Sequence, residues 1–366
     1  MHLKKQGVVL DFRETEAEKR AGLLTGQYAH VVDDKVYWQS KTPNKMLYAT
    51  IEGGVFSKPS GNSFLEGSLA SHNFVAFKDT RRGIPKEEKY KAIGGYHVGR
   101  NSIKGESTDH NILNSPIHPE LSSCSMSQGL EVVATGDNLW PEETRLSFND
   151  DFYHPKHANG LYTFKSHNGI EWSLYHDKPV ISSFTYGENG IPVAGDSMPS
   201  IFFDSNINQY VVYLRCNIKI GVRHVFYSRS KDLIAWETPK LISKSPEFDF
   251  EHENLYYMCA HPLSTGKYIA FSPHFRNDVN PVNKNARRYY DGKTLVMVSD
   301  DGINWKVVDE IFVRAATGHM TQPHVLSFVE EEDSYSIYVH EGFITHQNKL
   351  VKYTVDKKEF INLINK

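Results

Sequence analysis

The heptapeptide Ser166-His-Asn-Gly-Ile-Glu-Trp172 decides the fold, because its pattern returns further along the chain. The clearest further copies are Ser230-Lys-Asp-Leu-Ile-Ala-Trp236 and Ser299-Asp-Asp-Gly-Ile-Asn-Trp305. Two weaker copies lie on either side of these three, Thr50-Ile-Glu-Gly-Gly-Val-Phe56 and Thr354-Val-Asp-Lys-Lys-Glu-Phe360. In each copy a hydroxyl residue is followed two positions later by a carboxylate or amide and six positions later by an aromatic residue. An internal repeat of this kind indicates repeated structural units.

Each copy of the repeat predicts the turn of a β-hairpin. The residues that precede a copy are rich in β-branched and aromatic types, as in His224-Val-Phe-Tyr-Ser228, which is typical of a strand. The Asn or Asp side chain can bond the turn backbone, and the glycine can take a positive φ. The tryptophans of the three clear copies are 64 and 69 residues apart, a length that suits a four-stranded blade with its loops.

Five copies therefore predict an all-β protein, a five-bladed β-propeller of four-stranded antiparallel blades. Two more strand-like runs precede a copy, for example 199–203 and 210–214, with turn residues between them. Each blade is thus predicted to run from an inner strand through a second and a third strand to the repeat turn and an outer strand. A β-sandwich is the alternative architecture, but five similar turns at near-regular spacing favour the propeller.

The chain is predicted to form a single domain over residues 1–366. We expect the N-terminal segment 1–23, with a strand over Val8–Phe12 and a helical stretch over Glu14–Arg20, to close the ring against the last blade. A long insert at about 97–159 is expected between the second and third strands of blade two. Long inserts in compact folds are usually functional loops or oligomer contacts, so a homo-oligomer that forms through the insert is possible.

Composition limits the partners and the compartment. The formal net charge of −3 predicts no nucleic-acid partner, and no apolar run is long enough to span a bilayer, so no membrane partner is predicted either. The N-terminus lacks the apolar stretch of a signal peptide, and the three cysteines, Cys124, Cys216 and Cys259, are far apart. These features predict a cytoplasmic protein, or a periplasmic or secreted one if a leader has been removed.

Polar residues at the inner strands are the candidates for chemistry, because these strands otherwise pack through apolar side chains. Asp79, Asp196 and Glu253 are the predicted catalytic carboxylates, since glycoside hydrolysis needs one carboxyl group as general acid and another as base or nucleophile. Glu253 suits the acid role by its longer reach, with its proton retained near neutral pH by burial and mutual repulsion. Asp79 could instead cap a turn, Asp196 could be a turn residue, and Glu253 could be structural.

Further polar and aromatic residues near the inner strands are expected to contact a carbohydrate substrate: His72, Asn73, Ser197, Arg223, Tyr257, His319 and Gln322. A cluster of Arg215, Arg223 and Arg314 could bind a carboxylate or phosphate, although surface positions are the default for arginine. No metal site and no cofactor are predicted, because the histidines lack HxH or HxxxH spacing. A structural Ca²⁺ ion is possible, but nothing in the sequence specifically supports it.

Several stretches resemble a bacterial group of glycosyl-hydrolase-like five-bladed propellers, related in fold to the arabinanase/β-xylosidase and invertase/inulinase families. They are Ser71–Asp79, Tyr90–Gly95, Gly160–Trp172, Gly195–Ser197 and Glu253–Tyr257. The resemblance covers most of the chain from about residue 24 onward, apart from the insert. It implies three acidic residues on successive blades, places that Asp79, Asp196 and Glu253 take here. The chain departs from these families in lacking the invertase-type signatures and an acidic residue at the inner strand of blade one.

Three functions are compatible with these observations. The leading hypothesis is a glycoside hydrolase that acts on an oligosaccharide or polysaccharide through paired carboxylates in the central pocket. A non-catalytic carbohydrate-binding propeller is the second, and a glycoside phosphorylase or transglycosidase is the third. A close pair of carboxylates in one pocket would favour the hydrolase over the binding propeller.

Overall fold

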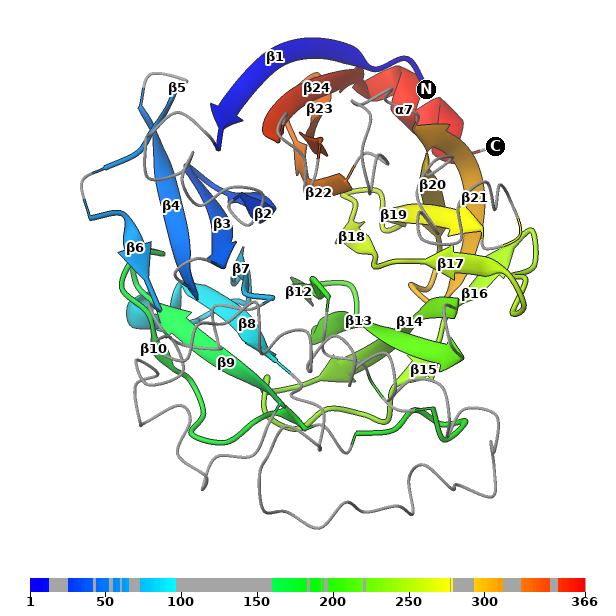
Figure 1. Ribbon diagram of the computed structural model, residues 1–366, viewed down its shortest axis with the longest axis horizontal. Coiled ribbons are helices and arrows are strands. Elements are labelled where there is room, and N and C mark those ends of the chain that lie inside the picture. Colours follow the sequence, from blue (N-terminus) through cyan, green and yellow to red (C-terminus); the bar gives the residue numbers. More distant parts are fainter. Residues whose placement is uncertain are drawn as a thin grey trace.

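The computed structural model confirms a five-bladed β-propeller (Figure 1). It describes residues 1–12, 26–41, 44–52, 55–59, 61–65, 73–96, 160–182, 185–191, 193, 197–219, 222–276, 278, 293–311, 324–342 and 348–365. The predicted insert at 97–159, its expected role as an oligomer contact and the predicted helix over Glu14–Arg20 lie outside these residues. Within the described part of the chain, no helix is long and apolar enough to cross a membrane.

The first three blades follow the predicted order from the inner to the outer strand. Blade one consists of β2 (Gln27–Val32), β3 (Lys35–Lys41), β4 (Asn44–Glu52) and β5 (Val55–Ser57), with β6 (Ser63–Phe64) beside β4. Blade two consists of β7 (Val75–Lys78), β8 (Tyr90–Tyr96), β9 (Gly160–Ser166) and β10 (Ser173–Leu174), with β11 (Ile181–Ser182) beside β9. Blade three consists of β12 (Ser200–Asp204), β13 (Gln209–Lys219), β14 (Val222–Ser230) and β15 (Lys240–Leu241).

The last two blades each depart from the simple order. Blade four consists of the divided inner strand β17 (Glu253–Leu255) and β18 (Cys259–Pro262), then β19 (Tyr268–Arg276), β20 (Lys293–Ser299) and β21 (Asn304–Ile311), with β16 (Ser243–Ser245) parallel to β21. Blade five consists of β22 (His324–Glu330), β23 (Ser334–Glu341), β24 (Lys349–Asp356) and, as its outer strand, β1 (Lys4–Asp11).

The N-terminal strand closes the ring, as the sequence predicted. β1 runs antiparallel to β24 from the pair Lys4↔Thr354 to the pair Asp11↔Lys349. Figure 1 shows β1 as the dark blue arrow beside the red strand β24 of the last blade. Blade five is therefore built from strands that lie far apart in the sequence.

The repeat turn has the predicted structure in the three clear copies. The Ser166 hydroxyl accepts a hydrogen bond from the backbone N–H of Gly169 (2.9 Å), and Asn168 Oδ1 accepts from the N–H groups of Ile170 and Glu171 (both 2.9 Å). The copies that begin at Ser230 and Ser299 make the same set of bonds. Three side-chain-to-backbone bonds thus fix each turn, which explains why the hydroxyl and the carboxylate or amide recur two residues apart.

Each glycine-containing turn also contacts the preceding blade. Tyr37 on β3 of blade one donates its hydroxyl to the carbonyl of Gly169 (2.7 Å), and Tyr213 on β13 of blade three donates to that of Gly302 (2.9 Å). The same Gly302 carbonyl accepts from the indole N–H of Trp305 (3.0 Å). The repeat therefore joins neighbouring blades as well as neighbouring strands.

The two weaker copies of the repeat do not form this turn. β4 continues past Thr50 to Glu52, and β5 pairs back from Val55, so the hairpin is displaced by two residues. The prediction for Thr354–Phe360 was wrong. Asp356 begins a helix, α7 (Lys357–Ile364), and its carboxylate accepts from the N–H of Glu359. An Asp followed three residues later by Glu favours helix initiation, and β1 already occupies the outer-strand position.

A second set of links joins the blades where the inner strands end. An aspartate at the end of one inner strand accepts a hydrogen bond from a tyrosine near the start of the second strand of the next blade. The pairs are Asp33 with Tyr90 (3.0 Å), Asp79 with Tyr210 (2.7 Å) and Asp204 with Tyr268 (2.5 Å). These links connect blade one to two, two to three and three to four, so three successive junctions use the same chemistry.

The turn glycine gives a first prediction. We expect Gly302→Ala to lower the free energy of unfolding by about 2 kcal/mol or more, because φ is +77° and the added Cβ would lie 2.9 Å from the Tyr213 hydroxyl. Gly266→Ala is the matched control, with φ of +85° and no atom within 4 Å of the added Cβ, so we expect a loss of only about 1 kcal/mol. Urea denaturation measures both, and equal losses would contradict the role of the Tyr213 contact.

The tyrosine–aspartate links give a second prediction. Tyr210→Phe should cost about 1–3 kcal/mol of stability, because it removes a phenol donor from the buried Asp79 carboxylate. Tyr335→Phe is the control. Tyr335 lies near the start of the second strand of blade five, and its buried hydroxyl has no hydrogen-bond partner among the described residues, so we expect a change below about 0.5 kcal/mol. Thermal or chemical denaturation that finds similar losses in both variants would refute the link.

Candidate functional site

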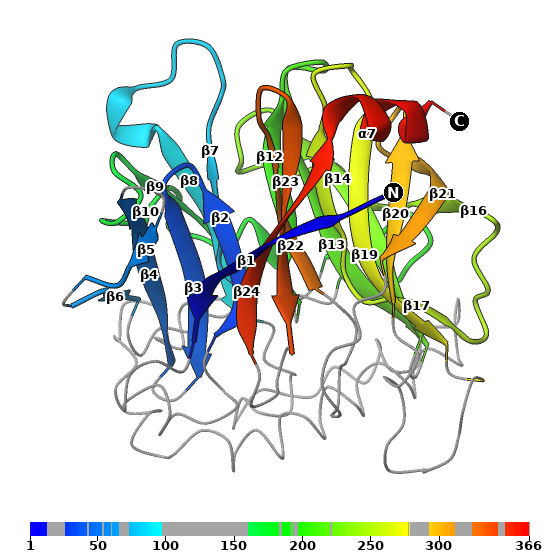
Figure 2. The same cartoon turned by 90° about the horizontal axis from the view of Figure 1, so that it is seen from above.

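The structure separates the two described residues of the predicted catalytic trio. Asp79 follows β7 at the end of the propeller that carries the repeat turns, whereas Glu253 opens β17 and pairs with Arg276 at the other end, called the strand-start end below. Figure 2 shows this from the side, with the cyan loop that follows β7 at the top and β17 near the bottom. Asp79 and Glu253 therefore do not form a carboxylate pair in one pocket.

Asp79 makes structural contacts at its end of the propeller. It accepts hydrogen bonds from the Tyr210 hydroxyl (2.7 Å) and from the backbone N–H of Arg81 (3.0 Å), and the Lys91 ammonium group lies 3.9 Å away. Asp33 and Asp204 hold the matching positions in the neighbouring blades. The sequence analysis also allowed Asp79 to cap a turn. The hydrogen bond from the backbone N–H of Arg81 is a contact of that kind.

Glu253 is buried and fully hydrogen-bonded. Its Oε1 accepts from His274 Nε2 (2.7 Å) and lies 3.0 Å from the ammonium nitrogen of Lys244, while its Oε2 accepts from the backbone N–H of Asp249 (3.0 Å). Leu255, which lies on the same face of β17, packs in the core between blades three and four. The carboxylate thus belongs to the inner strand β17 and is bonded to residues of β16 and β19.

These contacts hold Glu253 in its ionised form. Burial alone would raise the pKa of this carboxyl group, but the hydrogen bonds from His274, Asp249 and Lys244 outweigh burial and lower the pKa to about 2. A general acid must be protonated near the working pH. The sequence analysis expected the pKa of Glu253 to be raised, but its hydrogen-bond partners lower it. An ionised carboxylate suits a base, a nucleophile or a positioning group.

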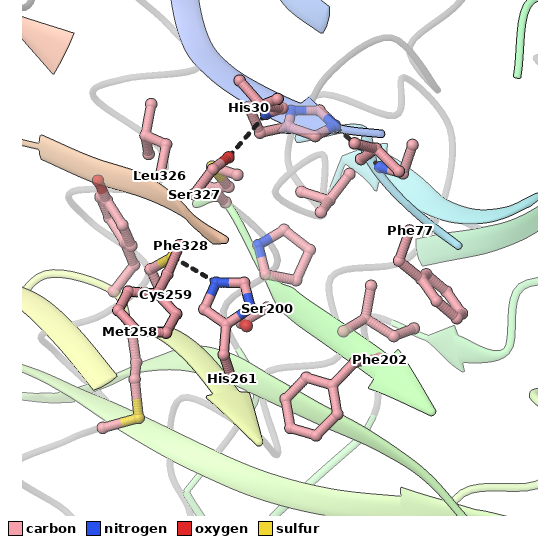
Figure 3. A pocket seen from close by; sticks show the side chains of 18 of the residues that line it. His30, Phe77, Ser200, Phe202, Met258, Cys259, His261, Leu326, Ser327 and Phe328 are labelled. Carbon is pink, nitrogen blue, oxygen red and sulfur yellow. Dashed lines mark hydrogen bonds between the residues drawn. The ribbon is translucent and has the colours of Figure 1, made fainter. Parts of the chain in front are cut away.

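An axial cavity of about 220 Å³ is lined by residues from all five blades (Figure 3). Its polar groups are already bonded within the protein. The backbone N–H of Ala76 in blade two donates to His30 Nε2 (3.0 Å), the N–H of Val31 in blade one donates to the Ser327 hydroxyl (2.7 Å), and Ser200 in blade three bonds the backbone of blade four. Since most other lining side chains are apolar, the cavity offers a sugar few hydrogen-bond partners.

Burial also shifts the pKa values of the titratable groups that line the cavity. It lowers the pKa of His30 to about 4, so the ring is neutral, with Nε2 as an acceptor and Nδ1 free to donate to the Tyr28 carbonyl (3.2 Å). Figure 3 shows Cys259 directed at His261, with a distance of 3.3 Å between sulfur and Nε2. Burial raises the pKa of this thiol and lowers that of the imidazole, so neither is primed as a nucleophile–base pair.

Three aromatic side chains, Tyr28, Tyr256 and Tyr257, form a tyrosine cluster across the axis, and Tyr256 follows Glu253 by three residues. The hydroxyls of Tyr28 in blade one and Tyr256 in blade four lie 3.4 Å apart, and both rings contact Tyr257. Tyr257 is buried and its hydroxyl lies 3.0 Å from His324 Nδ1, whereas Tyr256 is half-buried. Tyr256 is therefore the member of the cluster with the most surface exposed to solvent.

Two arginines flank Tyr256. The guanidinium carbons of Arg215 on β13 and Arg223 on β14 each lie 5.6 Å from the centre of the Tyr256 ring. The backbone of Arg223 also donates to Asn254 Oδ1 (2.9 Å), which fixes β14 against β17. The predicted substrate contact Arg223 and the predicted neighbour Arg215 are thus brought together, while Arg314 lies outside the described residues.

Backbone strain occurs at the same end of the inner strands. Tyr28 and Asn73 have φ values of 52° and 54°, a region that is costly for tyrosine but that asparagine adopts more readily. Tyr28 stands in an irregular stretch of β2, between Gln27 and His30, and Asn73 is buried just before β7. The hydroxyl of the predicted contact Ser197 is also buried, with no hydrogen-bond partner in the described part of the chain. Strained residues and an unsatisfied hydroxyl are typical of binding sites.

The remaining predicted site residues, Asp196, His72, His319 and Gln322, lie outside the described residues. Among the residues that are described, no group of three His, Cys, Asp or Glu side chains could hold a metal ion. Sequence reasoning missed Tyr28, Tyr256, Lys244 and His274. The tyrosines are two of the chain's 20, and their position at an inner strand is the one signal that could have selected them.

The comparisons with known proteins bear on the fold. No family model and no curated protein matches the sequence. Among solved structures, the chain is similar to one described as an RGII complex, with 12% identity, a TM-score of 0.53 and coverage of 96% of this chain and 91% of that one. It is also similar to a structure described as a glycoside hydrolase, with 13% identity, a TM-score of 0.51 and coverage of 96% and 90%.

A further similar structure is an α-L-arabinofuranosidase of Fusarium graminearum, with 9% identity, a TM-score of 0.47 and coverage of 98% of this chain and 99% of that one. The fold is shared with the structure described as a glycoside hydrolase. The resemblance to five-bladed glycosyl-hydrolase-like propellers that the sequence indicated is thereby confirmed for the fold.

The state of Glu253 gives a third prediction, on pH. Its pKa is about 2 in the folded protein against an ordinary value of 4.5, so the ion cluster stabilises the fold above pH 5 and loses that contribution as the pH falls. We expect the difference in unfolding free energy between the wild type and Glu253→Gln to shrink by about 2 kcal/mol from pH 6 to pH 3. Urea titrations at several pH values measure it, with Glu310→Gln, an exposed ion-pair partner of Lys293, as control. A difference that does not change with pH would contradict the ionised state.

Proposed function

We propose that the protein is a glycoside hydrolase that binds its sugar at the strand-start end of the axis, on the tyrosine cluster. The observation that carries the proposal is the buried, ionised Glu253 three residues before the half-buried Tyr256 along the divided inner strand of blade four. A half-buried aromatic ring suits the apolar face of a sugar, and glycoside hydrolysis requires a carboxylate, which Glu253 would supply.

The fold and the strain at the inner strands support this location. Structures that share the fold include one described as a glycoside hydrolase. At the strand-start end, Tyr28 carries strained backbone, and the buried Ser197 hydroxyl has no hydrogen-bond partner among the described residues. The axial cavity is less suitable, because its polar groups bond neighbouring strands.

In this proposal Glu253 acts in its ionised form, as a base or nucleophile, rather than as the acid expected from the sequence. The hydrogen bonds from His274 and Lys244 stabilise the negative charge that such a role requires. The acid must then be another group, and Asp196 stays the sequence-based candidate for the second carboxylate. Asp79 has no part in the proposal, since it lies at the opposite end.

A non-catalytic carbohydrate-binding propeller is the second candidate. One observation favours it: both oxygens of Glu253 are already bonded to protein groups, and Leu255 on the same face packs between blades. A positioning role for Glu253 would leave the tyrosine cluster and the arginines as a binding surface. The two candidates differ in turnover, whereas both require sugar binding.

The test is turnover of a panel of aryl glycosides and of plant, algal and bacterial oligosaccharides by the wild type and two variants. We expect Glu253→Gln to lower kcat by at least about 100-fold, and Tyr256→Ala to lower kcat/KM by at least about 10-fold through weaker binding. Glu310→Gln, on the same blade but exposed, should keep wild-type activity.

Thermal unfolding must accompany these assays, because Glu253 also contributes to stability. Full activity of a folded Glu253→Gln protein would refute the catalytic role of this residue. Sugar binding without turnover, in both the wild type and Glu253→Gln, would establish the binding propeller instead. If Tyr256→Ala bound and turned over every panel member like the wild type, the location of the site would be wrong.

A further inference from the structure

Phe250 is the one aromatic residue that is exposed among those whose burial the structure describes, with 45% of its surface accessible. It lies between β16 and β17, in a segment that Figure 2 shows reaching the strand-start end. A single exposed apolar residue needs no functional explanation by itself. Phe250 differs from such residues in how firmly its ring is held and in how close it lies to Glu253.

Two buried rings support Phe250 from within the protein. The His224 imidazole lies parallel to the phenyl ring, with an interplanar angle of 7° and 5.9 Å between ring centres, and the Phe248 ring lies 5.0 Å away at 73°. Both residues are buried, and burial lowers the pKa of His224 to about 4, so the imidazole is neutral. Phe250 is thus packed against buried rings although 45% of its surface remains in contact with solvent.

The backbone of Phe250 belongs to a turn that closes on Glu253. The N–H of Glu253 donates to the Asp249 carbonyl (2.9 Å), and the N–H of Asp249 donates to Glu253 Oε2 (3.0 Å). The Asp249 carboxylate accepts from the N–H of Glu251 (2.9 Å) and from the Arg276 guanidinium (2.6 Å), so the turn is also tied to β19. The α-carbons of Phe250 and Glu253 are at most about 11 Å apart, because only three residues of chain separate them.

The surroundings of the ring suit a sugar better than a protein partner. Its exposed neighbours Glu251 and His252 are polar, as is Asp278, the ion-pair partner of Arg276. The other large apolar residues that are exposed in the described part of the chain are Val8, Ile207 and Ile234. They lie on β1, after β12 and in a repeat turn, so they do not extend the apolar surface of Phe250 to the several hundred Å² that a protein interface needs. One ring with polar neighbours matches a sugar, which has an apolar face and hydroxyl groups at its edge.

We propose that Phe250 binds a second sugar unit of the substrate, so that the protein recognises an oligosaccharide rather than a single glycoside. The bond next to Glu253 would be the one that is cleaved, and a neighbouring sugar unit would pack on the Phe250 ring. A ring that is held in place before the ligand arrives loses little conformational entropy on binding, which favours affinity. The inference rests on the proposed function for the role of Glu253, and it adds a binding subsite and a minimum length of the substrate.

Binding is the direct test, because it does not depend on turnover. The full chain is titrated calorimetrically with xylo-, arabino- and galacturono-oligosaccharides, each as a series from the single sugar to the tetrasaccharide. In a series that the protein binds, we expect the affinity to rise at least about 10-fold from the single sugar to the longer members, because only the longer members reach Phe250.

Variants show whether Phe250 is responsible. Phe250→Ala should remove this gain in affinity with chain length, whereas Phe250→Trp, which keeps an aromatic surface, should retain it. Ile234→Ala is the matched control, since Ile234 is also an exposed apolar residue (37%) but lies in a repeat turn at the opposite end, and it should bind like the wild type. Thermal unfolding establishes that each variant is folded. Where a series is turned over, Phe250→Ala should lower kcat/KM at least about 10-fold more for the tetrasaccharide than for an aryl glycoside of the single sugar.

The outcomes separate this inference from the proposed function. The same dependence on chain length in the wild type and in Phe250→Ala, or an equal loss of affinity for short and long sugars in the variant, would overturn the inference and leave hydrolysis at Glu253 standing. Binding of longer sugars that depends on Phe250, in a protein that turns over no panel member, would support the inference and refute the hydrolase. A wild-type protein that binds no member of any series would overturn both.

Discussion

The inner strand of every propeller blade has one edge without a neighbouring strand, and its backbone N–H and C=O groups must still find partners. In this protein, side chains of adjacent blades supply them. His30 accepts from Ala76, the Ser327 hydroxyl accepts from Val31, and Ser200 both donates to and accepts from Ala260. The blades are therefore joined at the axis by polar bonds, between the apolar layers that separate them further out.

This constraint explains why polar residues along the axis do not by themselves mark a catalytic site. Asp79 and His30 stand at inner strands, and both serve the joints between blades. The strand-start end has other features. Its tyrosines meet across the axis, and two arginines lie beside one aromatic ring. These aromatic and charged groups, rather than polar residues alone, support the proposed site.

The fold could be predicted because the repeat turn is a local structure. The hydroxyl of Ser166 and the amide of Asn168 act within a few residues, so their spacing is visible in the sequence, and three copies fix the blade length. The prediction of a turn at the last weak copy was wrong because an aspartate can also begin a helix, as Asp356 does here. The site was harder to predict. Which of the adjacent Tyr256 and Tyr257 stays accessible, and that Lys244 and His274 reach Glu253, depend on packing between strands that are distant in sequence.

The ring closure has a consequence for the order in which the protein can form. The ribosome delivers β1 first, but its partner β24 last, since Lys4 pairs with Thr354. During synthesis the earliest strand remains without its sheet while four blades assemble from contacts close in sequence. Contacts between such distant residues cost the most chain entropy and form late. Synthesis of β24 is thus the event that allows β1 to complete the circle.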